Sequence, residues 1–180
     1  TYYHQKLAKI YQLFVRSQYR VVEIGYETGG LVAALKPAFG VGVDFSEKAI
    51  RSATQRHPDL FFLQCDAHQL SFKLNEKFDV VILSDLVNDL WDVQEVFEQI
   101  YNLSDGHTRI ILNAYSRLWE LPLKLAQRSG FAKPMLPQNW LTVTDIKGLL
   151  NIAGFEVIRT WPEIVWPFYM PILARFVNRF

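Results

Sequence analysis

The sequence predicts an α/β fold of the Rossmann-like, doubly wound type, in which helices flank a mostly parallel sheet. Short runs of β-branched and aromatic residues alternate with stretches whose apolar residues recur at helical spacing. The chain has 180 residues, of which 50% are hydrophobic, which is enough for one well-buried core. We therefore expect a single domain over 1–180, with an N-terminal helical cover at 1–19, a core at 20–160 and an aromatic tail at 161–180.

Six segments have the apolar character of buried strands, and five have the apolar spacing of helices. The strands are expected at 20–24, 39–44, 60–64, 78–84, 108–113 and 155–160. The helices are expected at 30–36, 47–55, 93–101, 118–127 and 145–153. Ser46 predicts the N-cap of the second helix, while Thr144 and Gly154 predict the cap and the stop of the last one.

Alternating strands and helices place the carboxyl ends of parallel strands at one edge of a sheet, where ligands bind. Two regions do not fit this alternation. Residues 128–141 contain Pro134 and Pro137, which predict a loop near that edge. The tail at 161–180 is rich in aromatic residues, and two interpretations stay open: packing on the domain, or contact with a partner or a membrane surface.

Composition restricts the function classes. Lysine and arginine number 19 against 18 acids, a formal net charge of +1, so no nucleic-acid partner is expected. Cys65 is the one cysteine, which excludes an internal disulfide and fits a reducing, cytoplasmic location. The four histidines lack the spacing of a metal-binding pair, so no metal site is expected. No apolar run approaches the roughly 20 residues of a transmembrane helix.

The first predicted strand leads into a turn that contains Gly25 and Gly29. Glycines between a strand and a helix permit a tight bend and let a ligand approach the backbone. The second predicted strand ends at Asp44, whose carboxylate could accept hydrogen bonds from both hydroxyls of a ribose. The alternatives are an ordinary glycine-bearing turn for the first signal and capping chemistry before Ser46 for the second.

The residues after the second and third strands add an adenine pattern. Phe45 could lie against an adenine ring or fill the core. The Asp66 carboxylate could accept a bond from an exocyclic amine, and the Ala67 N–H could reach a ring nitrogen. The alternative for Asp66 is an exposed turn aspartate. His68, close in sequence to Asp66, could line the site, but it is interpreted as a solvated turn histidine.

These motifs, in this order, resemble those of the class I S-adenosylmethionine-dependent methyltransferases. The resemblance rests on Glu23-x-Gly25-x-x-x-Gly29, Val-Gly-Val-Asp44-Phe-Ser, Cys-Asp66-Ala67 and Phe78-Asp-Val-Val-Ile-Leu-Ser-Asp85. The motifs cover residues 20 to about 90, and the strand-helix pattern extends the likeness to about residue 160. The resemblance implies S-adenosylmethionine as the cofactor and methyl transfer to a small-molecule acceptor.

The resemblance also implies roles for the residues near the methionine and ribose parts of the cofactor. Glu23 would steady the glycine turn, and Gly25 and Gly29 would lie beside the methionine part. Tyr26 belongs to the same turn and is included among the predicted cofactor-binding residues. Asp44 would hold the ribose.

Further along the sheet edge, Asp66 and Ala67 would recognise adenine. Ser84 and Asp85, at the end of the fourth predicted strand, would flank the methionine amine and the substrate entrance. Asp85 is the predicted catalytic residue, as a base or as a group that orients the acceptor together with Asn88. A helix N-cap or first-turn acid is the alternative for Asp85.

The sequence departs from the family at two places. Glu27 stands where the family usually has glycine, so a non-catalytic binding domain with an impaired cofactor site is an alternative function. The carboxylate of Glu27 could instead face the ammonium or sulfonium charge. The family's final antiparallel strand is hard to find before Phe180. A nicotinamide-dependent oxidoreductase is a third hypothesis, disfavoured because the G-x-G-x-x-G pattern fails at Glu27.

Overall fold

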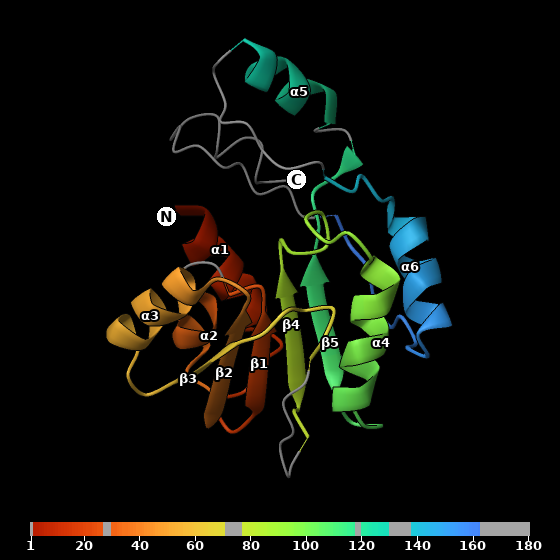
Figure 1. Cartoon of the computed structure of the whole chain (residues 1–180). Helices are drawn as coiled ribbons and strands as arrows, with labels where there is room; N and C mark the ends of the chain where they lie inside the picture. Colours follow the sequence, from red (N-terminus) through yellow and green to blue (C-terminus); the bar gives the residue numbers. More distant parts are fainter. Residues whose placement is uncertain (1, 27–29, 71–76, 118–119, 130–137, 163–180) are drawn as a thin grey trace.

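The computed structural model describes residues 2–26, 30–70, 77–117, 120–129 and 138–162. In this part of the chain five parallel strands form one sheet in the order β3-β2-β1-β4-β5. The strands are β1 (Arg20–Ile24), β2 (Phe39–Asp44), β3 (Phe61–Gln64), β4 (Val80–Ser84) and β5 (Arg109–Asn113). Figure 1 shows their arrows pointing to the same edge. The predicted doubly wound parallel sheet is confirmed.

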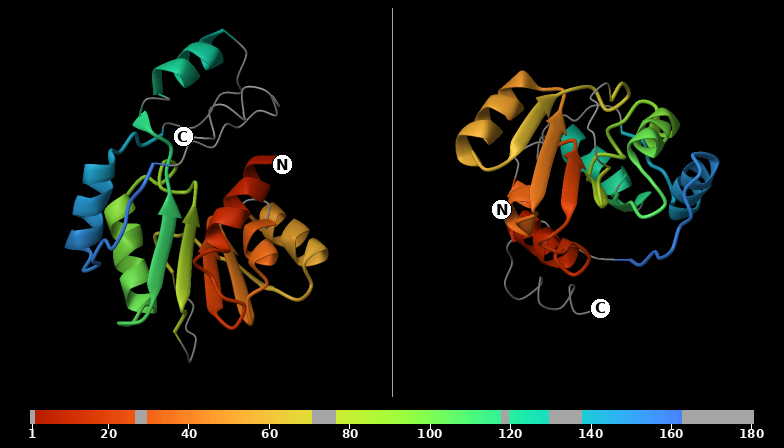
Figure 2. Two further views of the ribbon diagram at one scale, coloured as in Figure 1. Left: turned by 180° about the vertical axis from the view of Figure 1, so that it is seen from behind. Right: turned by 90° about the horizontal axis from the view of Figure 1, so that it is seen from below.

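Helices cover both faces of this sheet. They are α1 (Tyr2–Tyr11), α2 (Gly30–Leu35), α3 (Glu47–Arg56), α4 (Val93–Leu103), α5 (Glu120–Arg128) and α6 (Val143–Ile152). Helices α1, α2 and α3 lie on one face, and α4 and α6 lie on the other (Figures 1 and 2). Helix α5 stands beyond the edge at which the strands end (Figure 1).

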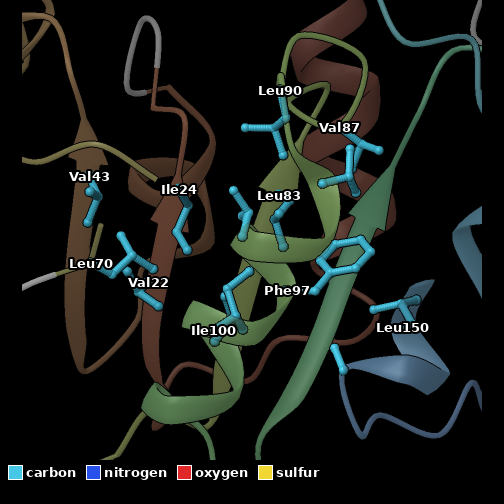
Figure 3. Close-up of a cluster of buried hydrophobic side chains, with 14 of the residues drawn as sticks. Val22, Ile24, Val43, Leu70, Leu83, Val87, Leu90, Phe97, Ile100 and Leu150 are labelled. Carbon is cyan, nitrogen blue, oxygen red and sulfur yellow. The ribbon is translucent and has the colours of Figure 1, made fainter. Parts of the chain in front are cut away.

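The core is two apolar layers separated by the sheet. Val21 of β1 and Val80 of β4 pack with α1 and α2. Val22 of β1 and Leu83 of β4 point to the other face and pack with α4 and α6. Figure 3 shows the second layer, with the strand side chains facing α4. Because successive strand residues point to opposite faces and both faces are covered, these strands are mostly apolar, with their polar residues near the strand ends. Burying each such side chain contributes about 1.5–3 kcal/mol.

The topology reverses beside β1. The chain moves outward from β1 through β2 to β3, then crosses back to β4 on the other side of β1. In open α/β sheets the crevice for a ligand lies at such a switch point, outside the carboxyl ends of the strands. The fold therefore directs attention to the loops that follow β1, β2 and β4.

The sixth predicted strand, at 155–160, is wrong. This segment has no regular secondary structure, although Phe155 and Val157 pack against the core and Ile158 is 85% exposed. The Phe155 N–H donates to the Leu150 carbonyl at 2.9 Å, which closes the end of α6. An alternating apolar pattern indicates which side chains are buried. Here the side chains are buried without any pairing of the backbone with β5, so no strand forms.

The last described residues connect the two helical layers. The segment runs from α6 toward α1, where the rings of Trp161 and Phe14 lie 5.4 Å apart (Figure 2). Most of the predicted aromatic tail, residues 163–180, lies outside the described residues, so its contact with a partner or membrane surface stays a prediction. Over the described ranges, every helix is too short or too polar to cross a membrane.

The predicted helix ends are confirmed at two positions and wrong at one. Ser46 caps α3, its hydroxyl accepting a backbone bond of 3.3 Å, and Gly154 ends α6 with φ +92°. Helix α6 is capped by Thr142 instead of Thr144. The reason is a capping box, in which Thr142 and Asp145 each accept the other's backbone N–H.

The predicted loop at 128–141 is confirmed only in its described C-terminal part. Residues 138–141 have no regular secondary structure, whereas Arg128 still belongs to α5. Residues 130–137, which include both prolines, lie outside the described residues.

Gly42 of β2 provides a test of the packing beneath the sheet edge. A Cβ at this position would lie 2.7 Å from Tyr26 Cδ2 and 2.9 Å from Phe62 Cδ1. We expect Gly42→Ala to lower the free energy of unfolding by about 1–3 kcal/mol, because two aromatic rings must move. Urea denaturation measures the change. Gly106→Ala is the control, since nothing lies within 4 Å of its Cβ, and an equal loss in both variants would contradict the prediction.

Candidate functional site

The ends of β1 and β2 bring the two strongest sequence signals together. The Gly25 N–H donates to the Val43 carbonyl at 2.9 Å, and Asp44 follows Val43 directly. The glycine bend and the acid therefore lie side by side on paired strands. This is the arrangement expected of a site for a nucleoside-like ligand at the edge of a parallel sheet.

Gly25 has a backbone conformation that favours glycine, with φ +77°. A Cβ here would lie 2.7 Å from Cδ1 of Leu86, which belongs to the loop after β4. Both the conformation and the close contact therefore exclude an unstrained side chain at this position. The other predicted turn residues, Glu27 and Gly29, lie outside the described residues.

Glu23 is buried at the end of β1 and is 4% exposed. Its Oε2 accepts a hydrogen bond from the Val32 N–H at 3.1 Å, which joins β1 to the first turn of α2 on either side of the glycine turn. Burial raises the pKa of Glu23 to about 8; the Val32 bond opposes this shift, and the charge of Asp85 adds to it. The burial of Glu23 therefore favours the protonated form of its carboxyl group.

The side chain of Tyr26 belongs to the core, and its predicted role in cofactor binding stays a prediction. Its side chain is 2% exposed, and its ring lies 4.8 Å from that of Phe62. The ring is buried on the face covered by α1 and α2, so only the Tyr26 backbone can reach a ligand at the edge.

Asp44 and Phe45 differ sharply in exposure. Asp44 is 8% exposed, and its Oδ1 accepts the Ser46 N–H at 2.8 Å, so the predicted capping chemistry is present. Phe45 is 77% exposed, which excludes the alternative that it fills the core. The Gln64 side chain donates to the Phe45 carbonyl at 3.1 Å and steadies the backbone there. An aromatic face is thus available beside a carboxylate.

Asp66, after β3, is held by His68. Its Oδ1 accepts the His68 N–H at 2.9 Å and lies 2.8 Å from His68 Nδ1. These bonds, the backbone one first, lower the pKa of Asp66. The interpretation of His68 as solvated is wrong: it is 6% exposed, because its ring stacks on that of Trp91 at 4.3 Å. Ala67, half-buried, lies between the pair.

Asp85, after Ser84 at the end of β4, takes a left-handed conformation with φ +56°. The Asn113 amide donates to Asp85 Oδ1, and the Asp85 N–H donates to Asn113 Oδ1 at 3.3 Å. The Tyr11 hydroxyl donates to the same Asn113 oxygen at 2.9 Å. The alternative that Asp85 caps a helix is wrong, since Asp92 caps α4.

Tyr11 keeps its proton in this arrangement. It is 2% exposed, and burial raises the pKa of its hydroxyl, with the charges of Asp85 and Glu23 acting in the same direction. A protonated phenol is the donor that Asn113 Oδ1 requires. Hydrogen bonds therefore connect α1, through the end of β5, to the end of β4.

Asn88 fastens the loop after β4 to its neighbours. It is 1% exposed; its Nδ2 donates to the Asn139 carbonyl at 2.8 Å, and its Oδ1 accepts the Tyr115 N–H at 2.8 Å. Both polar atoms of the side chain thus serve backbone groups. These bonds fix the loop that carries Asp85 and Leu86, and the role of Asn88 in orienting an acceptor stays a prediction.

The sequence missed three contributors to this edge. Asn113 ends a predicted strand just as Asp44 does, and a polar residue at that position was the available signal. His68 follows Asp66 too closely to be a metal pair, but its spacing suits a local hydrogen bond. Tyr11 gave no signal, since its partner Asn113 is 102 positions away.

Metal-binding chemistry has no support in the described ranges. Within them, no three histidine, cysteine, aspartate or glutamate side chains gather in a way that could hold an ion. The candidate site thus consists of a glycine bend, carboxylates at three strand ends and one exposed aromatic ring.

Comparison with known proteins identifies the family. A family model described as a methyltransferase domain matches residues 16–154, well over half of the chain. The chain belongs to the class I S-adenosylmethionine-dependent methyltransferases. S-adenosylmethionine is the cofactor of this family. The match does not favour the non-catalytic or the nicotinamide-dependent alternative.

Individual relatives of this methyltransferase domain are distant. A demethylmenaquinone methyltransferase from Streptomyces griseus is 24% identical over 126 residues, 70% of this chain and 54% of the relative. The chain thus spans about half the length of that relative. Magnesium protoporphyrin IX methyltransferase from Synechocystis, solved with bound SAH, gives a TM-score of 0.69 at 22% identity, covering 87% of this chain and 75% of that one. A methyltransferase from Mesorhizobium loti gives a TM-score of 0.69 at 16% sequence identity, covering 84% of this chain and 81% of that one. These two likenesses show the fold.

The buried carboxyl of Glu23 makes stability depend on pH. Its pKa is about 8 in the folded chain against its usual value of 4.5, so the folded chain holds an extra proton between these two pH values. The free energy of unfolding should therefore fall as pH rises through this window. Between about pH 6 and about pH 9 this fall in the free energy of unfolding should be on the order of 3 kcal/mol. We expect Glu23→Gln, which keeps an acceptor for the Val32 N–H, to remove it.

Urea denaturation at about pH 6 and about pH 9 measures this difference. Glu98→Gln, at an exposed position of α4, is the matched control and should retain the fall seen in the wild type. The same pH dependence in Glu23→Gln as in the wild type would show that Glu23 is ionised in the folded chain.

Proposed function

We propose that this methyltransferase domain transfers a methyl group from S-adenosylmethionine to a small-molecule acceptor. The observation that carries the proposal is the pairing of the glycine bend with Asp44: the Gly25 N–H donates to Val43, the neighbour of Asp44, at 2.9 Å. A ribose on the carboxylate and a methionine part over the bend are parts of one molecule. The two features support one ligand better than two.

The residues at the edge fit the cofactor in three respects. Gly25 is half-buried and has φ +77°, so its backbone is partly accessible at the bend, as the methionine part requires. Asp44 ends β2 as a nearly buried carboxylate, which suits two ribose hydroxyls. Phe45 is exposed, and Asp66 and Ala67 follow the neighbouring strand, as an adenine site requires.

The remaining chemistry concerns alignment. When bound, S-adenosylmethionine supplies a methyl group on a positively charged sulfur. Transfer of this group to an acceptor would leave a neutral thioether and release a proton from the acceptor, so the chain's own residues would have to hold the acceptor in line and accept that proton. Holding the reacting atoms in line supplies much of the rate of such a displacement. The chain's contribution is therefore mainly to fix both partners.

We propose that Asp85 orients the acceptor and receives its proton. Asn113 holds both the carboxylate and the backbone of Asp85, and Tyr11 holds Asn113. Such support limits the rotamers of a carboxylate that is only partly buried. Asp85 is thus the described acid best prepared to accept a hydrogen bond from an acceptor hydroxyl or amine.

The acceptor itself is proposed by class. The Streptomyces relative is a demethylmenaquinone methyltransferase, and Tyr115 and Trp140 lie half-buried in the segments that Asn88 fastens. Aromatic walls suit a flat, apolar ring. A quinone precursor is therefore the first acceptor to assay, with transfer of a labelled methyl group as the readout. Polyketides, lipids and sugar-linked compounds follow in the same assay.

Binding of the cofactor depends on Asp44 if the proposal is correct. We expect the wild type to bind S-adenosylhomocysteine and Asp44→Asn to bind it about 10- to 100-fold more weakly, because the amide lacks the charge that strengthens both ribose bonds. Isothermal titration calorimetry measures both affinities. The amide oxygen still serves the Ser46 N–H, so the fold should persist.

Asp105→Asn is the matched control for this experiment. Asp105 also accepts a backbone bond from a nearby turn residue, His107, at 2.8 Å, but it precedes β5 and lies at the opposite edge of the sheet. The Asp105→Asn variant should bind S-adenosylhomocysteine with the affinity of the wild type. Absence of binding to the wild type up to millimolar ligand would overturn the proposed function, and unchanged affinity in Asp44→Asn would remove the role of Asp44.

A further inference from the structure

The loop after β3 contains an acid whose orientation is fixed by a neighbour. Asp66 Oδ1 accepts the backbone N–H of His68 at 2.9 Å, and His68 Nδ1 lies 2.8 Å from the same oxygen. The Asp66 side chain is nevertheless 59% exposed. An exposed aspartate normally samples several rotamers, and ordering one upon binding costs conformational entropy. Here two bonds order it in advance.

The imidazole of His68 is itself held on its other sides. Its Nε2 lies 3.4 Å from the N–H of Asp92, the residue that caps α4. The backbone N–H can only donate, so Nε2 accepts. Nδ1 therefore carries the hydrogen and donates the hydrogen bond that Asp66 Oδ1 accepts. The Trp91 ring stacks on the imidazole at 4.3 Å with an interplanar angle of 22°. The ring is thus held by the start of α4, a sequence neighbour of the acceptor loop.

This arrangement leaves the carboxylate able to accept another bond. Both hydrogen bonds that the described residues make to the Asp66 carboxylate end at Oδ1. A carboxylate has two oxygens and about four lone-pair directions. The exposed remainder of the group can therefore receive an N–H from a ligand, provided that the group stays in place.

We propose that His68 is a positioning residue for adenine recognition: it holds the Asp66 carboxylate in the orientation that accepts the exocyclic amine of the cofactor. The proposal rests on the proposed function, in which adenine lies beside Asp66. His68 touches neither adenine nor the reacting atoms. Its contribution is selectivity for a purine that carries an amine, exercised through Asp66.

The probe is a pair of ligands that differ only at this amine. One is S-adenosylhomocysteine, and the other is its purine analogue, in which hydrogen replaces the exocyclic amine and the ring nitrogens are unchanged. The ratio of their affinities isolates the contact with Asp66, because a general loss of structure weakens both ligands alike. A hydrogen bond to a charged group should give the wild type about a tenfold preference for the amine, or about 1.4 kcal/mol.

Two substitutions separate the hydrogen bond from the packing of the ring. His68→Phe keeps a ring against Trp91 but has no N–H for Asp66. His68→Asn loses the ring but keeps an N–H at the position of Nδ1. Calorimetry should show that His68→Phe reduces the preference to about threefold or less, whereas His68→Asn keeps it within about a factor of two of the wild type. Circular dichroism and thermal melting confirm that each variant is folded.

Each outcome is informative. A wild-type chain that binds neither ligand overturns the proposed function, whereas binding of both with an unchanged ratio in His68→Phe overturns only the role of His68. If His68→Phe does not fold, Asp66→Ala at an exposed position serves instead and should abolish the preference. An unchanged ratio in Asp66→Ala would show that the amine is not recognised here, and a preference lost in folded His68→Asn would assign His68 a packing role.

Discussion

All functional contacts in this protein depend on the position of β1 between β2 and β4. Because β1 pairs in parallel with both neighbours, the three strands end at the same edge, where the chain reverses its direction across the sheet. The bend at Gly25 then lies beside Asp44 on one side and Leu86 on the other. The sheet thus brings residues that are far apart in the sequence to one edge, and side-chain hydrogen bonds such as Tyr11 to Asn113 add to this arrangement.

The buried polar residues are gathered at this edge. Among the described residues, the polar or charged side chains in the buried class belong to Glu23, Asp44, His68 and Asn88. Each ends a strand or follows one closely, and each has a hydrogen-bond partner. A buried polar group without a partner destabilises the fold by about 1–3 kcal/mol. The four buried polar side chains thus lie near the edge where a ligand is expected, and the hydrogen bonds of each offset the cost of its burial.

The sequence predicted what local patterns determine. Apolar runs located five strands, glycine and aspartate at strand ends located the cofactor edge, and Ser46 located a cap. It could not predict partners chosen by the tertiary fold. Tyr11 meets Asn113 only because α1 packs over the end of the sheet, and the burial of His68 requires Trp91 from another loop. The prediction of a strand at 155–160 failed for a different reason. The alternating apolar pattern described the burial of the side chains correctly, but such a pattern does not determine whether the backbone pairs with a neighbouring strand.

Leu86 has a consequence for how the two halves of the edge behave. Its side chain lies where a Cβ of Gly25 would be. The turn proposed to hold the methyl donor and the loop proposed to face the methyl acceptor are therefore in contact through this one leucine. Asn88 anchors that loop two residues farther on. A shift of the turn after β1 therefore reaches the loop after β4 by direct contact through Leu86, so a change in the shape of one alters the other.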